Sequence, residues 1–416
     1  MSKKNTAKVS QETTPKEPQV ITGFDNIEFI DDPHGQIQTV KFNLRNPTKG
    51  NPTYLVSMAN ALRRTIIADL PNYLASRELT QFNIANSVLN HDVLTQRLHL
   101  CPIRLENLIK HDNPTGIMIR GNLTNDTKQI RSVYLHELQV EGYEDPAEFW
   151  THPEILWTRL QPGQQIEFST LLEFGTSHRN DSGFQPCSAV RYTFATSDAA
   201  MDKIIEKKTF KTEEDKERFR VGHREQGVHR LQDGTPYEYQ FQLESLGVYP
   251  PQEVVPSACL ILEGRYAQIQ VILDRVANHI KNGEMKQGVI KIDDVITVQK
   301  YKGELEAFDF VIYYENDTLG NQWTQQIRTD DTVKFIGYRI PHPQDPLVVI
   351  RIALNEHSED YNEYMLECIE KLKEHAEKLE KFWVGIRRMW HERCPLPEMK
   401  DWEDWVQSRI FEIVHH

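Results

Sequence analysis

Cysteine is scarce in this sequence. The 416 residues include five cysteines, and no two of them form a Cys-x-x-Cys pair. An odd, widely spaced set predicts a protein of a reducing compartment rather than a disulfide framework. Without closely spaced pairs, the sequence gives no support for a structural zinc site.

Long apolar runs and an excess of positive charge are also missing. No apolar run reaches the roughly 18 residues that a transmembrane helix needs, so we expect no membrane contact. Residues 1–21 are polar and lack the apolar segment of a secretory signal, so they are expected to form a disordered tail. The net charge of −13 argues against direct binding of nucleic acid through a basic face.

Motifs of known catalytic sites are missing as well. The sequence has no glycine-rich phosphate loop, no Gly-x-Ser-x-Gly and no His-Glu-x-x-His. Its acidic pairs, among them Asp293–Asp294 and Asp330–Asp331, are expected in turns rather than in a magnesium-binding cluster. We therefore predict no catalytic residue, no metal site and no cofactor bound by this chain.

The sequence does contain a well-marked amphipathic helix, which we expect from Tyr54 to Leu70, with Pro71 ending it. Its apolar residues are spaced by three and four and so share one face. They are Leu55, Met58, Ala59, Leu62, Ile66 and Leu70. Arg63 and Arg64 lie off this face.

Four short motifs accompany this helix in a fixed order. They are residues 57–64 (Ser-Met-Ala-Asn-Ala-Leu-Arg-Arg), 69–71 (Asp-Leu-Pro), 86–89 (Asn-Ser-Val-Leu) and 96–103 (Gln-Arg-Leu-His-Leu-Cys-Pro-Ile). Their order and spacing resemble the alpha-like subunits of cellular RNA polymerases: the bacterial alpha subunit, the archaeal D subunit and the third subunit of eukaryotic polymerase II. Eukaryotic third subunits usually carry a cysteine-rich zinc loop that this sequence lacks, so no metal is carried over.

Later segments continue the resemblance. Residues 174–192 place a glycine before His178 and Arg179, and they resemble the segment that lies beside the second-largest polymerase subunit in this family. Residues 243–247 (Leu-Glu-Ser-Leu-Gly) resemble the strand by which the family's chain returns to its dimerisation domain. Between these motifs, alternating apolar residues predict a mostly β inserted domain, and the mixed charges of residues 201–235 predict a solvated connector.

A heptad stripe then predicts a helix that packs on another helix, closed by Asn282–Gly283. Its apolar residues are Leu262, Tyr266, Ile269, Leu273, Val276 and Ile280. A second long helix with an apolar seam is expected from Ser358 to Trp390. The aromatic segment that follows it can dock on the chain's own surface or on another subunit, and the sequence does not decide between them.

Before that second helix, residues 317–321 (Asp-Thr-Leu-Gly-Asn) and 341–343 (Pro-His-Pro) flank a predicted strand. This pattern resembles the small partner of the same system, the eleventh subunit of polymerase II and the archaeal L subunit. Asp317 or Thr318 is expected to cap a helix. Gly320 is expected to let a neighbouring backbone approach closely.

The predicted fold class is α+β, with two alpha-like dimerisation domains paired within one chain and a mostly β domain inserted in the first. The predicted boundaries are 1–21 for the disordered tail, 22–104 and 236–286 for the first dimerisation domain, 105–235 for the inserted domain with its charged connector, 287–390 for the second dimerisation domain and 391–416 for a C-terminal extension.

The resemblance assigns roles to individual residues. The predicted intramolecular dimer interface comprises Leu55, Met58, Leu62, Ile66, Leu262, Ile269, Leu273, Val276, Leu319, Trp323, Leu372 and Leu379. The predicted contacts with large subunits are Arg63, Arg64, Arg97, His178 and Arg179. The motif residues of the second half are Asp317, Thr318, Gly320, Asn321, Pro341, His342 and Pro343.

The resemblance implies a non-catalytic assembly-platform subunit of a multisubunit DNA-directed RNA polymerase. In that family the second-largest and then the largest subunit dock on the paired domains, small subunits join them, and the catalytic magnesium belongs to the large subunits. Fusion of both halves resembles the large nucleocytoplasmic DNA viruses, which implies an intracellular protein of the virion and cytoplasmic viral factory, or of the nucleus. Two alternatives stay open: a stand-alone protein-binding scaffold that kept the fold, and an enzyme whose site the sequence does not reveal.

Overall fold

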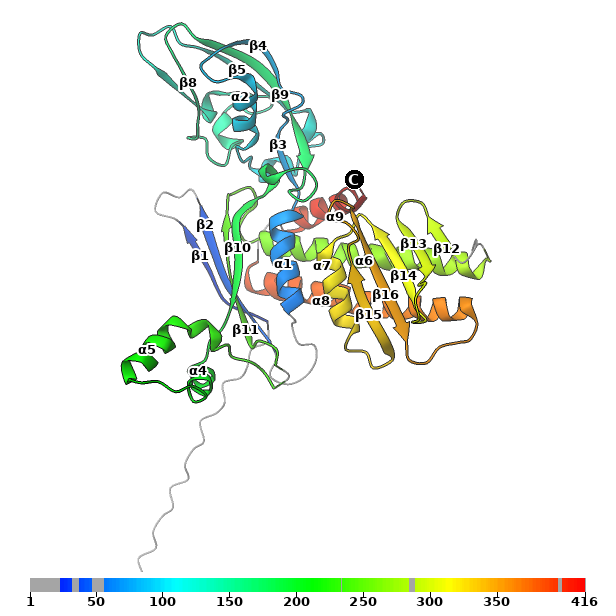
Figure 1. The fold of residues 1–416 in the computed structure, drawn as a ribbon. Coiled ribbons are helices and arrows are strands. Elements are labelled where there is room, and N and C mark those ends of the chain that lie inside the picture. The colour runs from blue at the N-terminus through cyan, green and yellow to red at the C-terminus, as the bar shows by residue number, and fades with distance from the viewer. Residues whose placement is uncertain are drawn as a thin grey trace, which may run out of the picture.

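The structure, a computed structural model, describes residues 23–31, 37–46, 56–232, 234–283, 289–395 and 399–415. Three larger antiparallel sheets, a two-stranded sheet and a bundle of long helices make up most of these residues (Figure 1). The predicted tail and the start of the predicted first helix, with Leu55, fall outside the described residues.

The first sheet has four strands in the order β1 (Gly23–Asp31), β2 (Gln38–Arg45), β11 (Glu238–Ser245) and β10 (Cys187–Phe194). Val40, Phe42 and Leu44 alternate with polar residues, as do Tyr239, Phe241 and Leu243, and this alternation predicts two strands. Both are confirmed as β2 and β11, whose apolar residues face each other in register and are buried. Phe42, for example, lies opposite Phe241, with stacked rings 4.8 Å apart.

Helix α1 packs against this sheet and against helix α6. The described part of α1 runs from Val56 to Ala68 and ends two residues before the predicted end. It contacts β10 and α6 (Val254–Lys281). The predicted end of α6 is confirmed, since Asn282 caps it and Gly283 adopts a φ of +72°.

The second half forms a five-stranded sheet in the order β12 (Val289–Ile292), β13 (Ile296–Lys300), β14 (Phe308–Tyr313), β16 (Leu347–Leu354) and β15 (Val333–Arg339). Helices α7 (Asp317–Ile327) and α8 (Tyr361–Arg393) contact it. Phe308, Phe310 and Ile312 alternate in a predicted strand, and a further strand is predicted from Leu347 to Leu354. These are confirmed as β14 and β16, and the strand predicted between the two motifs is β15; β12 and β13 were not predicted.

The prediction for the cap of α7 was wrong by one residue. Asn316, in extended conformation, is the N-cap, and its side chain accepts a 2.9 Å hydrogen bond from the backbone N–H of Thr318. The short amide side chain of Asn316 reaches the second N–H of the helix, so neither Asp317 nor Thr318 is needed as the cap.

The close approach predicted at Gly320 is confirmed, although the neighbours are side chains rather than backbone. A Cβ at this position would lie 2.7 Å from the ring of Tyr338 and 2.9 Å from the side chain of Val348. Gly320 thus lets α7 lie close to β15 and β16.

Between α1 and β10 in the sequence, the chain forms a further body outside the first sheet. Its sheet contains β3 (Asn72–Ala75), β4 (Gln81–Asn86), β5 (Met118–Thr124), β7 (Gln139–Val140) and β9 (Gln165–Gly175), and β6 (Arg131–Tyr134) pairs with β8 (Leu156–Leu160). The helices here are α2 (His91–His99) and α3 (Leu105–Leu108), with short 3-10 turns at 114–116, 135–137, 146–148 and 182–184. β3 and β4, which the predicted boundaries give to the first domain, pair with β9.

The charged connector contains two helices, α4 (Asp198–Ile205) and α5 (Glu213–Gly222), followed by a 3-10 turn at 224–226. They form a small lobe at one end of the first sheet (Figure 1).

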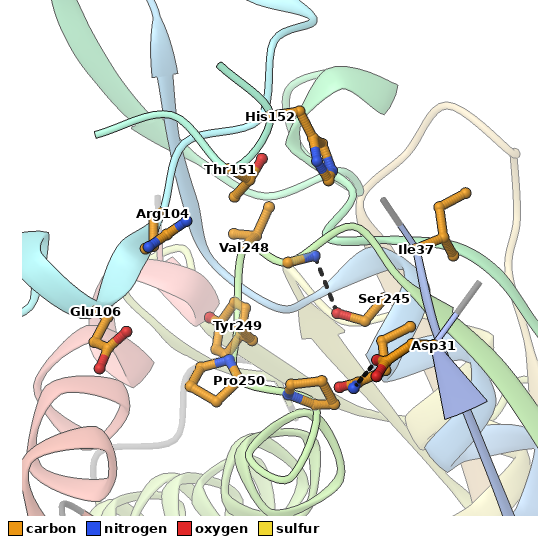
Figure 2. A pocket seen from close by; sticks show the side chains of 13 residues that line it. Asp31, Ile37, Arg104, Glu106, Thr151, His152, Ser245, Val248, Tyr249 and Pro250 are labelled. Atoms are coloured by element: carbon orange, nitrogen blue, oxygen red, sulfur yellow. Dashed lines mark hydrogen bonds between the residues drawn. The ribbon is translucent and has the colours of Figure 1, made fainter. Parts of the chain in front are cut away.

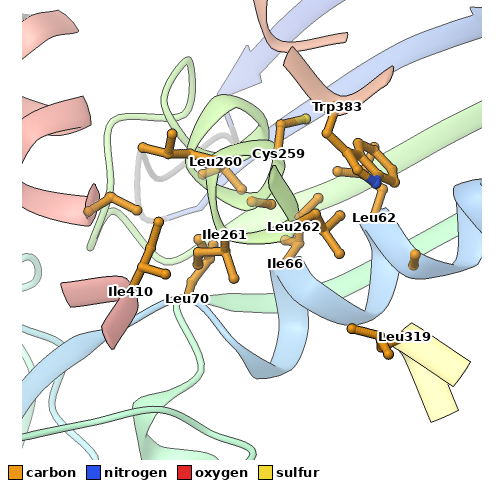
Figure 3. Close-up of a cluster of buried hydrophobic side chains, with 14 of the residues drawn as sticks. Leu62, Ile66, Leu70, Cys259, Leu260, Ile261, Leu262, Leu319, Trp383 and Ile410 are labelled. Atoms are coloured by element: carbon orange, nitrogen blue, oxygen red, sulfur yellow. The ribbon is translucent and has the colours of Figure 1, made fainter. Parts of the chain in front are cut away.

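The long helices α6 and α8 pack along each other, and the C-terminal helix α9 (Met399–His415) packs on α6. The aromatic extension therefore docks on the chain's own surface. Side chains from α1, α6, α7, α8 and α9 meet in one buried cluster (Figure 3). Among the described residues, no helix combines the length and apolarity needed to cross a membrane.

Candidate functional site

The predicted interface residues lie in the buried cluster between α1, α6, α7 and α8. All of those that the structure describes are buried: Met58, Leu62, Ile66, Leu262, Ile269, Leu273, Val276, Leu319, Trp323, Leu372 and Leu379. Two buried hydrogen bonds also tie the helices together. Tyr266 of α6 donates to Gln322 of α7 at 2.9 Å, and the indole N–H of Trp323 donates to the carbonyl of Leu372 in α8 at 3.2 Å. Their role as an interface between two alpha-like domains stays a prediction.

Next to this cluster lies a buried group of charged side chains. Asp69 follows α1, Arg265 belongs to α6, and Glu315 precedes α7; all three are almost fully buried. The Arg265 guanidinium lies 3.2 Å from the Asp69 carboxylate. Burial raises the pKa of Glu315 and the positive charge of Arg265 opposes that rise. Such groups are stable inside a protein only when paired, so this cluster fixes how the three segments meet.

The loop after β9 closes over this charged cluster. The backbone N–H of His178 donates to the carbonyl of Ala68 at 2.8 Å, which joins the loop to the end of α1. The imidazole Nε2 of His178 lies 3.4 Å from the amide nitrogen of Asn316, so the same loop reaches the segment that caps α7. Residues far apart in sequence are thereby brought together.

A cleft of about 550 Å³ opens at this junction. It is lined by Arg64, His178, Arg179, Tyr314, Glu315, Asn316, Asp317, Ile340, Pro343, Gln344, Asp345 and Pro346. Three of the five predicted large-subunit contacts therefore gather here, together with Asp317 and Pro343 of the second-half motifs. The turn that carries Pro341, His342 and Pro343 is exposed at the rim.

Two features of the cleft indicate a surface made for contact. One guanidinium nitrogen of Arg179 is buried without a hydrogen-bond partner, and burial lowers the pKa of Arg179. Tyr314, an exposed aromatic residue, has a φ of +62°, which a non-glycine residue rarely adopts. Backbone strain of this kind costs on the order of 1–3 kcal/mol and gathers at functional sites.

The other two arginines lie elsewhere. Arg63 donates to the side chain of Asn60 one turn earlier in α1. Arg97 of α2 donates to the carbonyls of Leu156 and Trp157 at 2.7 and 2.6 Å. The guanidinium of Arg97 thus holds α2 against β8.

Sequence reasoning missed Tyr314, Glu315 and Asn316. Their place in the cleft depends on the distant loop around His178, so no local pattern reveals it. One signal was available, since Arg265 lies three residues after Leu262 and four before Ile269, on the apolar face of α6, where an unpaired charge would be costly.

One group among the described residues has the side chains of a metal site: Asp330, Glu374 and His375. A cation is already provided by Lys371, whose ammonium lies 3.2 Å from the Asp330 carboxylate and 3.3 Å from that of Glu374. Burial raises the pKa of Asp330, but hydrogen bonds from Thr332, His375 and Lys371 outweigh it and hold that pKa well below its usual range. These contacts explain the group as an ion-pair network.

A second cavity, of about 310 Å³, lies where β11 ends and contains Ser245 and Gly247 of the predicted return motif (Figure 2). Two pairs of its polar groups are hydrogen-bonded to each other: Gln38 donates to Asp31, and the N–H of Gly247 donates to Ser245. The ring of His152 is 3.1 Å from the carbonyl of Leu246. We read this cavity as the junction of the inserted segment with the first sheet.

Comparison with known proteins bears on the second half. Residues 307–381 match the model of the RNA polymerase Rpb3/Rpb11 dimerisation domain. This part of the chain is therefore similar to the dimerisation domain of the alpha-like RNA polymerase subunits. The DNA-directed RNA polymerase II subunit rpb11 of Dictyostelium discoideum is 40% identical over 62 residues, which are 15% of this chain and 48% of that protein. The chain thus spans about half the length of this relative.

The matched residues begin just before β14 and end within α8, so they contain the whole of α7 and the Pro341–Pro343 turn. The lining residues from Tyr314 to Asp317 and from Ile340 to Pro346 therefore lie within the segment that matches the Rpb3/Rpb11 model. Arg64, His178 and Arg179 lie outside it, and the guanidinium of Arg64 is 3.9 Å from the carboxylate of Asp317.

Proposed function

We propose that this chain is a non-catalytic assembly-platform subunit of a multisubunit DNA-directed RNA polymerase, with both alpha-like halves fused in one chain. One observation carries the proposal. A domain of the Rpb3/Rpb11 dimerisation type has its helices α7 and α8 packed against α1 and α6 of the same chain. A dimerisation domain whose apolar face is covered in cis needs no separate partner chain for that face.

The cleft is the proposed docking site for the second-largest polymerase subunit, with the largest subunit and small subunits joining afterwards. Arg64, His178 and Arg179 on one wall and Asp317 with the exposed Pro341–Pro343 turn on the other offer contacts from both halves at once. Only a chain with both halves correctly packed presents this surface, which suits an ordered assembly.

The proposal includes no cofactor on this chain, with the catalytic magnesium held by the large subunits. The fused arrangement supports an origin among large nucleocytoplasmic DNA viruses. It therefore supports action in the virion and viral factory, or in the nucleus. A stand-alone scaffold remains the second candidate, since the same cleft could hold a partner outside the polymerase.

Affinity purification of the tagged chain from its native setting tests the proposal. We expect two large subunits to be recovered in stoichiometric amounts, with RNA synthesis in the eluate. Replacing Arg64→Glu together with His178→Glu should reduce their recovery at least tenfold while the chain keeps a cooperative thermal melt. Because Arg64 lies 3.9 Å from Asp317, only a small fall in the melting temperature is expected. The control pair Arg218→Glu and Arg388→Glu reverses two charges that are exposed on α5 and α8.

The control pair should leave recovery unchanged, because neither arginine lies near the cleft. Normal recovery with the cleft variant would reject the cleft as the docking site. Recovery of the wild-type chain alone, folded and monomeric, would favour the scaffold.

A further inference from the structure

The C-terminal helix α9 packs closely on α6. Gly264 makes room for it, since a Cβ there would lie 2.6 Å from the side chain of Ile410. Trp402, Trp405 and Val406 are buried on the same side of α9. Figure 3 shows Ile410 at the edge of the core cluster, close to Leu260 and Leu70 in that view.

Charged groups also hold α9 to the long helices. The guanidinium of Arg387 in α8 lies 3.0 Å from Glu263 of α6 and also pairs with Glu403 of α9. The imidazole of His391 lies 3.2 Å from the same Glu403 carboxylate. The carboxylate of Glu403 in α9 thus lies against two residues of α8. These contacts restrict sliding of α9 along α8 as well as its separation from it.

Helix α9 also contacts the inserted segment. Trp405 lies 6.3 Å from the ring of Tyr73 in β3, and the guanidinium of Arg409 lies 5.4 Å from the ring of Phe174 in β9. Tyr73 and Phe174 are cross-strand partners, with their rings 5.3 Å apart. α9 therefore supports the β3–β9 pair at its last residues.

That pair ends at the docking cleft. Asn72 pairs with Gly175, and the chain turns directly into the loop that carries His178 and Arg179. The side chain of Asn180 accepts a hydrogen bond from the N–H of Thr176, which closes the loop on itself. The loop is bonded to Ala68 at the end of α1, and its orientation also depends on where the β3–β9 pair is held, to which the contacts of α9 contribute.

We propose that α9 is a positioning helix: through Trp405 and Arg409 it holds the β3–β9 pair and so fixes the loop of His178 and Arg179 in the orientation that the partner subunit binds. This inference rests on the proposed function of the cleft. It assigns a role to the C-terminal extension that is separate from the pairing of the two halves, because α9 contacts neither α1 nor α7 extensively.

Hydrogen exchange on the full chain tests the positioning role without any partner. Gly264→Leu places a bulky side chain against Ile410 and should undock α9. Gly385→Leu is the matched control, since Gly385 lies inside helix α8 and a Cβ added there would meet nothing within 4 Å. We expect amides of residues 174–180 to exchange at least tenfold faster in Gly264→Leu, while α8 and Gly385→Leu stay at wild-type rates.

The second variant is Trp405→Asp, which places a charge in the buried contact of α9 with Tyr73. In both variants, faster exchange of the amides of α9 itself reports that the helix has undocked. The inference is overturned if α9 exchanges faster while residues 174–180 keep their wild-type rate. It is equally overturned if neither variant undocks α9, because the inference requires that these two contacts hold the helix.

Capture of the large subunits separates this inference from the proposed function. If both hold, Gly264→Leu lowers recovery about as much as the Arg64→Glu and His178→Glu variant does, and Gly385→Leu does not. If the loop becomes mobile in Gly264→Leu but the cleft variant still recovers both large subunits, the proposed docking site fails and the positioning role stands. Unchanged capture by Gly264→Leu, with capture lost in the cleft variant, would show that partner binding does not need α9.

Discussion

At the scale of single residues, the most informative positions are charged side chains inside the core. Arg265 and Asp69 are paired and nearly inaccessible, and Glu315 is buried beside them. A buried pair of this kind is weak evidence for stability, because desolvation offsets the attraction. Its better-supported effect is geometric, since the three charges can be satisfied together only when α1, α6 and the start of α7 are correctly placed.

Glu253, at the start of α6, is a buried carboxyl group without such a partner. One of its oxygens has no hydrogen-bond partner. Burial, and after it the negative charge of Glu403, raise the pKa of Glu253 to about 7 against the opposing charge of Arg387. The folded protein therefore holds a proton on Glu253 over a pH range in which the unfolded chain has released it.

Glu253→Gln is predicted to stabilise the protein at pH 8 and to change little at pH 5. Because the folded pKa lies above the unfolded one, the wild-type protein loses stability as pH rises from about 4.5 to about 7. The amide removes this loss, which amounts to up to about 3 kcal/mol. The measurement is the apparent melting temperature of both proteins at the two pH values.

The control for this prediction is Glu392→Gln, at an exposed glutamate near the end of α8. It should shift the melting temperature equally little at both pH values. The quantity to compare is the difference in melting temperature between Glu253→Gln and the wild-type protein. If this difference is the same at pH 5 and at pH 8, Glu253 is ionised in the folded protein.

At the scale of elements, regular alternation or helical spacing was enough to predict a strand or helix. β2, β11, β14 and β16 alternate or are continuously apolar, and their predicted positions are confirmed. β1 was missed because its pattern is interrupted: Asn26 has a φ of +48° and the register with β2 shifts there. β12 and β13 were missed because they have only four and five residues.

The fit of α7 against its sheet gives a test at this scale. Gly320→Ala places a methyl group against Tyr338 and Val348, which cannot both move without disturbing the sheet. We expect it to destabilise the fold by about 1–3 kcal/mol. At Gly385 in α8 an added Cβ meets no neighbour within 4 Å, so Gly385→Ala should instead stabilise the fold by roughly 0.5–1 kcal/mol through helix propensity.

Both glycines lie inside helices, so the propensity gain is the same in each and the difference between the two variants isolates the contact. The readout is the shift of the thermal melt on the same instrument and at the same protein concentration. Equal shifts in the two variants would mean that the neighbours of Gly320 relax without cost.

At the scale of the whole molecule, sequence reasoning predicted the class of elements and their order but not every pairing. The cleft shows why. Its walls come from residues 64, 178–179, 314–317 and 340–346, and which loops meet depends on tertiary packing that no local pattern encodes. Motifs could name Arg64, His178, Arg179 and Asp317, but the partner of each became visible only in the fold.

The packing of both halves in one chain leads to the last prediction. If the chain is cut between Gly283 and Val289 and the two parts are produced together, they should purify as a one-to-one complex. The contacts of α6 with α8 and of α1 with α7 remain available, and only the covalent link is lost. The melting temperature of the cut protein should rise with concentration, whereas that of the intact chain should not, because association then enters the folding equilibrium.

Leu62→Asp in the first part should abolish the complex, since Leu62 is buried where α1 meets the other helices and a carboxylate there would be unpaired. In the intact chain the same change should give insoluble or partly unfolded protein. Leu79→Asp, at an exposed leucine of the inserted segment, is the control and should leave the complex intact. Two parts that fold but elute separately would show that the halves are held together by the chain alone and not by the buried face between them.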